Sequence, residues 1–353
     1  MPRRDNYYDY IRALAALLVL FAHKKGQMPG GSIGVSIFFC LSGFLITQIL
    51  IGLPSLTISN VAKFIFRRWM RIYPLYVFTI GVTFLLMQHY RPESLSDFAS
   101  AIPGMVTFTR LPAQWTGFAA TVGWTLHAEF WFYVFFPIIF MLTYKRGLLP
   151  LAIGFLIVAS ILSKIVAGHG EPDKWPTGND QWYTAIYLDQ MMYGAICAIL
   201  IARHSSFVKL FTSKLWVWGG LVIILAMGKL LPFPTFDVYW YLQSSGAALL
   251  CAVAILHHEA NPKTSKDNFI AWIGRISFSI YLVHAIVLDY VPTGELLPKL
   301  DTPLMLAIIL ALSWLTEKYV ERPGIRLSKW LAPFTSKSTT ERLPEPKMVA
   351  PFP

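Results

Sequence analysis

Two polar residues, Arg12 and His23, interrupt an apolar stretch near the start of the chain. The eleven-residue spacing leaves their side chains only about 20° apart around an α-helix and roughly 16 Å apart along it. Arginine is a permanent cation that suits phosphate, whereas histidine gains and loses a proton near neutral pH. The face that they share carries Asp9, Ala15, Ala16 and Val19, and the opposite face carries Leu14, Leu17, Leu18 and Phe21. This pattern predicts a helix whose polar face borders a ligand cavity and supports proton transfer.

Each of these two residues also has an ordinary structural explanation. In this structural explanation, Arg12 extends to the inner lipid headgroups and His23 simply lies at the outer membrane interface. A charged residue within a membrane span, however, usually faces the interior of the bundle and serves function. The shared face of small residues therefore favours the functional interpretation.

A second basic group lies between two apolar segments and contains Lys63, Arg67, Arg68 and Arg71. For Lys63 and Arg67 we prefer the general excess of basic residues in cytoplasmic loops as the explanation. Arg68 and Arg71 are three residues apart and therefore share one helical face. Because guanidinium groups bind phosphate through paired hydrogen bonds, these two arginines predict a phosphate-rich ligand.

The composition that must position these residues is that of a membrane protein. Of 353 residues, 55% are hydrophobic, 15% aromatic and only 14% charged, whereas a soluble domain has about 25% charged residues. The mean hydropathy is +0.53. The net charge of +11 comes from residues clustered between apolar runs, so membrane topology explains it better than nucleic-acid binding. The three unclustered cysteines predict neither a disulfide framework nor a metal site.

The fold class predicted from the apolar runs is all-α, a polytopic transmembrane helix bundle with about ten spans. The expected spans are 9–24, 33–51, 72–88, 124–142, 147–166, 182–202, 215–231, 238–257, 270–290 and 303–320. They form one membrane domain, 1–330, followed by a Pro-rich polar tail, 331–353, which we expect to be disordered.

The distribution of basic residues predicts that both termini lie in the cytoplasm. With the N-terminus inside, 21 of the 30 Lys and Arg residues fall on the cytoplasmic side and 8 on the opposite side, as the positive-inside rule requires. Residues 89–123 then form the longest connection outside the membrane, and we expect it to cover the acceptor.

Motifs along the chain resemble those of the acyltransferase-3 family of integral membrane acyltransferases. The matching residues are Asp9, Arg12 and His23; Phe38–Leu45, which contains Ser42; Arg68–Pro74, which contains Arg71; Trp124–Glu129 with Phe132 and Tyr133; Ser277, Tyr281 and His284; and Tyr319–Pro323. Because these six motifs occur in order over residues 9–323, the resemblance is specific although each motif alone is weak.

The resemblance implies an O-acyltransferase of the bacterial inner membrane. Its donor would be cytoplasmic acyl-CoA, with acetyl-CoA as the expected form and no permanently bound cofactor. Its acceptor would be a hydroxyl of a carbohydrate such as a cell-surface polysaccharide, lipopolysaccharide or glycolipid. We expect Arg12, Arg68 and Arg71 to bind the phosphates of the donor, since the distance from Arg12 to His23 is close to the length of an extended pantetheine arm.

His23 is the predicted reaction centre because acyl transfer to a hydroxyl needs a group that accepts the proton. Glu129 is the carboxylate expected to orient its ring; the alternative for Glu129 is a structural hydrogen bond between helices. In a direct route, His23 activates the acceptor. In a relay route, His23 or Ser42 first takes the acyl group. The direct route is preferred.

The remaining candidates have either an acceptor-binding or a structural role. Ser42 with the following glycine indicates tight helix packing more often than nucleophilic catalysis. Ser277, Tyr281 and His284 share one helical face, which fits acceptor binding or a polar seam between helices. Asp9, Trp124 and Tyr133 complete this group.

Two other function classes compete with catalysis. A transporter or flippase of a lipid-linked glycan or acyl donor would also be a bundle with buried charges, but such carriers often contain an inverted repeat, and the motif-bearing segments here all differ. A non-catalytic membrane scaffold is the second alternative, against which the presence of Arg12, His23 and Glu129 argues.

Overall fold

The computed structural model describes residues 6–24, 30–109, 122–168, 183–230, 238–263, 265–291 and 300–333. Within these ranges the chain is helical and contains no β-strand, as expected for the all-α class. The long helices are α1 (Tyr7–Lys24), α2 (Gly30–Ile51), α3 (Ile58–Tyr90), α4 (Leu95–Val106), α6 (Trp124–Tyr144), α7 (Leu149–Gly168), α9 (Leu188–Arg203), α11 (Leu215–Leu230), α12 (Val238–Ala260), α14 (Ser277–Tyr290), α16 (Asp301–Thr316) and α17 (Arg322–Leu331). Shorter ones are α8 (Tyr183–Ile186), α10 (Ser205–Val208) and α13 (Phe269–Arg275), with 3₁₀ turns at Pro92–Ser94 and Lys209–Thr212 and a π-helical segment at Glu317–Glu321.

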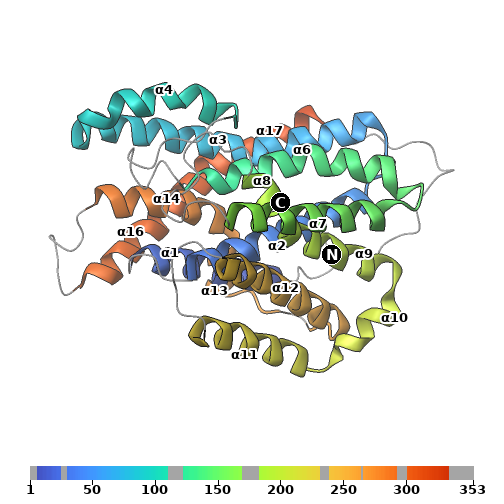
Figure 1. Cartoon of the computed structure of the whole chain (residues 1–353). Coiled ribbons are helices and arrows are strands. Elements are labelled where there is room, and N and C mark those ends of the chain that lie inside the picture. The colour runs from blue at the N-terminus through green and yellow to red at the C-terminus, as the bar shows by residue number, and fades with distance from the viewer. Residues whose placement is uncertain are drawn as a thin grey trace.

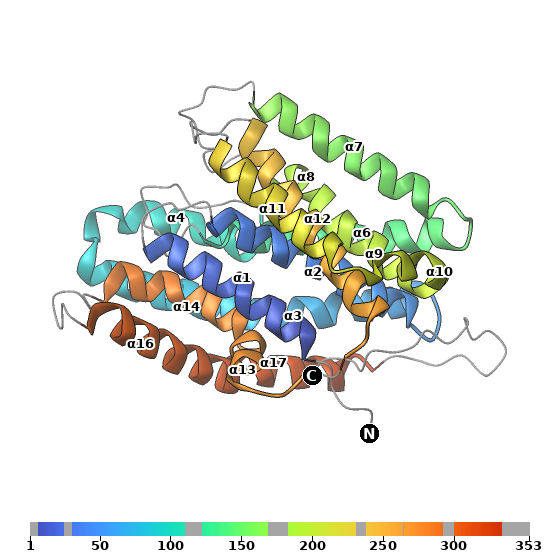
Figure 2. The same ribbon diagram turned by 90° about the horizontal axis from the view of Figure 1, so that it is seen from below.

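Helix α2 lies in the middle of the bundle and contacts α1, α6, α9 and α12. Seen from below, α1, α2 and α3 run between α14 and α16 on one side and α7, α11 and α12 on the other (Figures 1 and 2). The closest approach joins α2 to α9. A Cβ added at Gly43 would be 1.8 Å from the Met191 carbonyl oxygen, and one at Gly194 would be 1.9 Å from that of Cys40. The Ser-Gly motif of α2 thus serves close helix packing.

Helix α1 packs between α2 and the α13–α14 pair. Its small residues Ala15 and Ala16 are buried, whereas Leu14 is 54% exposed and Phe21 36% exposed. The predicted small buried face is therefore confirmed. The predicted bulky outer face is confirmed only in part, because Leu17 and Leu18 are partly buried against the apolar clusters. A Cβ at Gly274 of α13 would be 1.9 Å from the Asp9 carbonyl oxygen, so this glycine lets α13 approach the polar end of α1.

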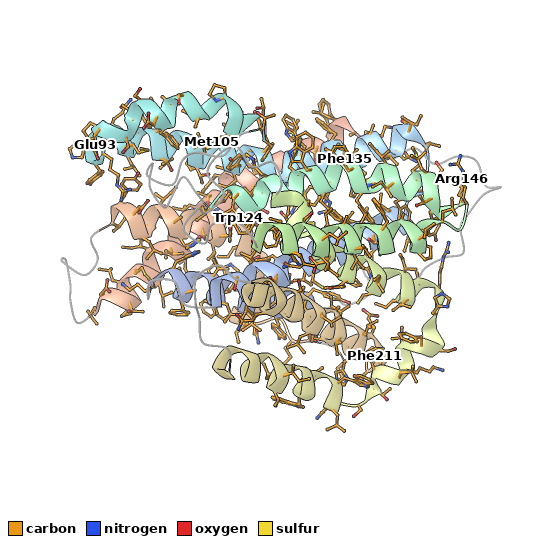
Figure 3. All side chains as sticks on the ribbon, in the orientation of Figure 1. Glu93, Met105, Trp124, Phe135, Arg146 and Phe211 are labelled. Carbon is orange, nitrogen blue, oxygen red and sulfur yellow. The ribbon has the colours of Figure 1, made fainter. Side chains whose placement is uncertain are left out.

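Large apolar side chains cover the outside of several helices. On α7, Leu151 is 72% and Phe155 70% exposed, and on α6, Phe135 is 54% exposed and points away from the bundle (Figure 3). Water would disfavour such surfaces, whereas lipid accepts them. The outer faces thus support a multi-pass membrane protein.

Four helical stretches are long and apolar enough to cross a membrane: Gly31–Ile51, Ile58–Tyr90, Trp124–Tyr144 and Asp301–Leu331. The number rises to six if two bent pairs each count as one span, α9 with the segment after it and α13 with α14, the latter bent by 78°. Each of the ten predicted segments contains helix in its described part. The total of ten spans and the cytoplasmic termini stay predictions, and the tail from 334 onward lies outside the described residues.

Candidate active site

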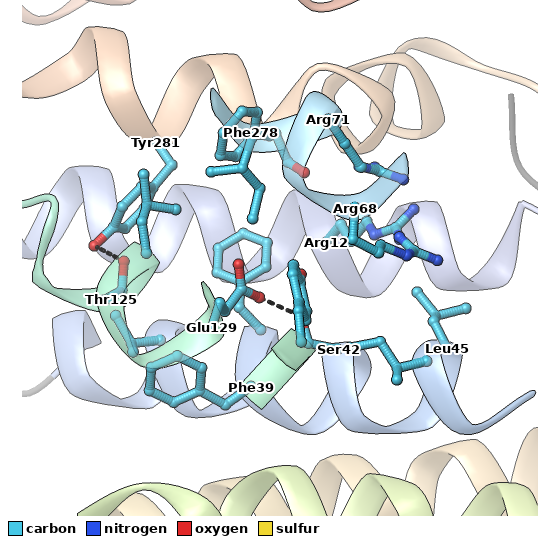
Figure 4. Close-up of a pocket in the computed structure, with 17 residues that line it drawn as sticks. Arg12, Phe39, Ser42, Leu45, Arg68, Arg71, Thr125, Glu129, Phe278 and Tyr281 are labelled. Carbon is cyan, nitrogen blue, oxygen red and sulfur yellow. Dashed lines mark hydrogen bonds between the residues drawn. The ribbon is translucent and has the colours of Figure 1, made fainter. Parts of the chain in front are cut away.

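A cavity of about 100 Å³ lies where α1, α2, α3, α6 and α14 meet (Figure 4). Eight of the predicted site residues line it: Arg12, Ser42, Arg68, Arg71, Glu129, Tyr133, Ser277 and Tyr281. Apolar side chains complete the walls, among them Val35, Phe38, Phe39, Leu45, Ile46, Ile72, Leu126 and Phe278. The polar residues come from five different helices, so packing rather than local sequence brings them together.

Three arginines converge at one end of this cavity. Arg12 projects from α1, and Arg68 and Arg71 project from one face of α3 (Figure 4). Helix α3, which carries Arg68 and Arg71, begins after Thr57. The Thr57 hydroxyl fixes this start because it accepts a hydrogen bond from the backbone N–H of Asn60 at 3.3 Å.

The adjacent Arg67 turns away from this arginine cluster. Its Nε donates to the carbonyl oxygen of Ala332 at 2.9 Å, and the residue is absent from the cavity wall. The structure thus separates Arg67 from Arg68 and Arg71, although Arg67 and Arg71 are four residues apart on the same helix. The three clustered guanidinium groups can bind a ligand that carries several phosphates.

The middle of the cavity contains a serine and a carboxylate in contact. Ser42 Oγ on α2 donates to Glu129 Oε1 on α6. Tyr133, one helical turn beyond Glu129, lies beside both groups. Arg68 and Arg71 interact electrostatically with the Glu129 carboxylate. This carboxylate therefore lies between the arginine cluster and a hydroxyl that faces the cavity.

Tyr281 closes the opposite end of the cavity. Its hydroxyl donates to the Val122 carbonyl oxygen at 3.0 Å and accepts from Thr125 Oγ1 at 2.9 Å. Both partners belong to the start of α6 and the residues just before it, so the ring is fixed between α14 and α6. The Tyr281 and His284 ring centroids are 5.8 Å apart, which places a histidine directly behind this wall.

His23 lies beyond that wall and does not line the cavity. Its Nδ1 is 3.0 Å from Nε2 of His284, and the two rings stack with centroids 5.2 Å apart. The sequence interpretation paired His23 with Glu129, but the structure places His284 against the His23 ring and Ser42 against Glu129. Arg12 and His23 thus share a helix, as the spacing predicts, but not a single cavity.

The other two predicted residues outside the wall have structural partners. Asp9 is fully buried, and its Oδ1 is 3.4 Å from Nη1 of Arg12, so it helps to hold that guanidinium. Trp124 packs against Phe39 and Tyr187, with ring centroids 6.1 and 5.0 Å away.

Glu321 belongs to the Tyr319–Pro323 motif but is not among the site residues predicted from the sequence. In the structure Glu321 is 3% exposed, and its Oε2 accepts from Ser279 Oγ at 3.2 Å. It also interacts electrostatically with Arg71 and Arg12, whereas Arg322 pairs with Glu317 at 2.5 Å. The π-helical turn that contains Glu321 is a signal of functional sites but cannot be recognised from composition.

Among the described residues, no group of three or more His, Cys, Asp or Glu side chains is arranged to hold a metal ion.

A sequence model of the acyltransferase-3 family, which is described as an acyltransferase domain, matches residues 5–317 of the chain. The chain belongs to the acyltransferase-3 family. The matched region contains every residue of the cavity wall and the His23–His284 pair.

Curated relatives agree with this family. O-acetyltransferase OatA of Staphylococcus aureus strain NCTC 8325 is 22% identical over 353 aligned residues, which cover 91% of this chain and 57% of the relative. OatA of strain MRSA252 gives the same values. The chain thus spans little more than half the length of these relatives. No solved structure matches it.

Proposed function

We propose that this acyltransferase-3 family member is a membrane O-acyltransferase that transfers an acetyl group from acetyl-CoA to a carbohydrate hydroxyl. The observation that carries the proposal is the cavity in which Arg12, Arg68 and Arg71 converge beside Ser42 and Glu129. The names of the relatives support acetyl transfer to an oxygen. The carbohydrate acceptor and the bacterial inner membrane follow from the family resemblance of the motifs.

In this proposal the phosphates of the donor bind the three arginines. Each guanidinium forms charge-assisted hydrogen bonds with phosphate oxygens, which are about twice as strong as neutral ones. The pantetheine arm then extends past Ser42 towards Phe38 and Tyr281. The distance of roughly 16 Å that eleven helical residues span brings the thioester near His23 once the Tyr281 end of the cavity opens.

The transfer itself needs a base on the acceptor side. His23 accepts the proton of the acceptor hydroxyl while its oxygen bonds to the acyl carbon. The carbon–sulfur bond breaks, and CoA leaves as a thiolate that takes up the proton. In the alternative relay route, Ser42, which is hydrogen-bonded to Glu129, is the nucleophile that first takes the acyl group before its transfer to the acceptor. We prefer the direct route because a neutral imidazole can accept the proton of the acceptor hydroxyl as its oxygen attacks.

The test combines two measurements on matched variants. Membranes that contain the wild-type chain should release free CoA thiol from acetyl-CoA in the presence of a glycan fraction, and mass spectrometry of that fraction should show an added acetyl mass. His23→Ala should abolish both signals, whereas His89→Ala, at an exposed histidine in the last turn of α3, should retain both. Movement of glycan or donor across the membrane without thioester consumption would instead support a carrier.

A further inference from the structure

Two imidazoles are in direct contact outside the cavity wall, and only one has a role in the proposed reaction. His23 is at the end of α1, and His284 is in α14, where it is 1% exposed. The 3.0 Å separation of His23 Nδ1 and His284 Nε2 is a hydrogen-bond distance. Because each neutral ring has one N–H and one acceptor nitrogen, such a contact restricts the tautomers of both.

The direction of this hydrogen bond follows from a second contact. His284 Nδ1 is 3.2 Å from the carbonyl oxygen of Ile280, and it has a further backbone hydrogen bond to Tyr281. A carbonyl oxygen can only accept, so Nδ1 of His284 carries the proton. In a neutral His284 ring, Nε2 is then the acceptor, and Nδ1 of His23 must donate to it. The basic nitrogen of His23 is consequently Nε2.

Surrounding contacts keep both rings in this arrangement. Leu20, Ile280, Val283 and Val287 belong to one buried apolar cluster that joins α1 to α14. The next residue after His23, Lys24, forms an ion pair with Asp301 at the start of α16. The apolar cluster thus holds α1 against α14 beside the histidine pair, and the ion pair holds the end of α1 against α16.

We propose that His284 is a positioning residue that fixes His23 in the tautomer with a protonated Nδ1 and a basic Nε2. The proposal rests on the proposed function for the role of His23 as the base. Nε2 faces the N-terminal region of α2, where a Cβ added at Gly31 would be 3.9 Å from it. In this proposal the acceptor hydroxyl approaches Nε2 from the side of Gly31.

The experiment compares His284→Gln with His284→Leu. The amide oxygen of glutamine can accept from Nδ1 of His23 in place of the imidazole nitrogen, whereas leucine fills similar space without an acceptor. Nitrogen-15 NMR of the full chain in lipid, labelled at histidine, reports which ring nitrogen is protonated, and subtraction of the His23→Ala spectrum assigns the signal. Thiol release from acetyl-CoA gives the turnover and the donor KM of the same samples.

We expect wild-type protein and His284→Gln to hold His23 in the Nδ1–H form, and His284→Leu to shift it to the Nε2–H form. Turnover in His284→Leu should fall by about 100-fold, the lower range of a general base's contribution, with the donor KM unchanged. An Nε2–H form in the wild type, or a shift in His284→Leu without loss of turnover, would overturn the proposal. Because the spectrum does not depend on the reaction, an inactive wild-type protein with the Nδ1–H form would contradict the proposed function alone.

Discussion

Replacing Arg68 with alanine should weaken CoA binding without unfolding the protein. Arg68 lines the cavity together with Arg12 and Arg71, and its guanidinium is also 5.7 Å from the Phe64 ring centroid. A hydrogen bond to a charged group contributes about 1.5–3 kcal/mol, which corresponds to a rise in Kd of roughly 10- to 150-fold. We therefore expect Arg68→Ala to raise the Kd by an amount within that range.

The assay is equilibrium binding of CoA to purified protein in lipid nanodiscs, at several salt concentrations. Arg67→Ala is the matched control, because Arg67 is the adjacent residue on the same helix and bonds to the Ala332 carbonyl instead of lining the cavity. Its Kd should equal that of the wild type. The Kd of Arg68→Lys should lie between those of the wild type and Arg68→Ala, since lysine keeps the charge but lacks the planar arrangement of donors that arginine has. Binding of S-acetylpantetheine, which lacks the nucleotide and its phosphates, should be the same in all variants.

Equal weakening by Arg67→Ala and Arg68→Ala would refute this reasoning, because only one of them faces the cavity. An Arg68→Ala variant that loses S-acetylpantetheine as strongly as CoA would also refute it, since the arginine would then support the whole cavity rather than the phosphates. Wild-type affinity that does not fall with added salt would exclude a phosphate contact at the accessible mouth of the site.

Two further predictions concern the packing that builds the site. Gly194→Ala places a Cβ 1.9 Å from a carbonyl oxygen of α2, so it should separate α2 from α9 and lower the melting temperature in detergent. Gly154→Ala is its control, because a Cβ there meets nothing within 4 Å and should leave the melting temperature unchanged. Lys164→Met removes the cation 2.6 Å from buried Asp189 and should destabilise the protein by about 3–5 kcal/mol, as loss of one partner of a buried pair does. The exposed Lys145→Met is its control, and equal melting temperatures for the two lysine variants would contradict the prediction.

The helical nature of the chain follows from its composition, because long apolar runs satisfy their backbone only as helices in lipid. The pattern does not show where a helix bends. The 78° break between α13 and α14 occurs inside a predicted continuous span, 270–290. Helix α4 lies in the predicted 89–123 connection. Its 12 residues are too few to cross a membrane, so a count of spans does not predict it. Its buried residues are Phe98, Ala101 and Met105, and the helix packs against α3. Residues 110–121 of that connection lie outside the described residues.

Relations within one helix could be predicted, whereas partners on different helices could not. The common face of Arg68 and Arg71 depends only on the 3.6-residue period, and the structure has it. The contact between His23 and His284 depends on how α14 packs against α1, two helices that are far apart in the sequence. For the same reason, residue type alone suggests Glu129 as the carboxylate that orients His23. In the structure, Glu129 instead accepts a hydrogen bond from Ser42.

The charges around the cavity explain how the interior of the bundle tolerates three clustered arginines. Asp9 pairs with Arg12, and Glu129 and Glu321 both interact electrostatically with Arg71, so three carboxylates offset three guanidinium groups in the low-dielectric interior. An incoming phosphate must compete with the negative charge of these carboxylates for its attraction to the three cations. Glu321→Gln removes one competitor while its amide oxygen can still accept from Ser279.

Glu321→Gln should therefore bind CoA more tightly than the wild type, a change opposite in sign to that of Arg68→Ala. A net change of about 1 kcal/mol, typical of a charge interaction in a partly screened site, corresponds to roughly a fivefold lower Kd. The nanodisc assay that measures the arginine variants also measures this one, and Glu317→Gln serves as the control because Glu317 pairs with Arg322 instead. If Glu321→Gln weakened CoA binding, the Glu321 carboxylate would be holding Arg71 in place for the ligand. That result would contradict the proposed competition between carboxylate and phosphate. A tighter variant with slower thiol release would show that the same competition helps CoA to leave after the acyl group has been transferred.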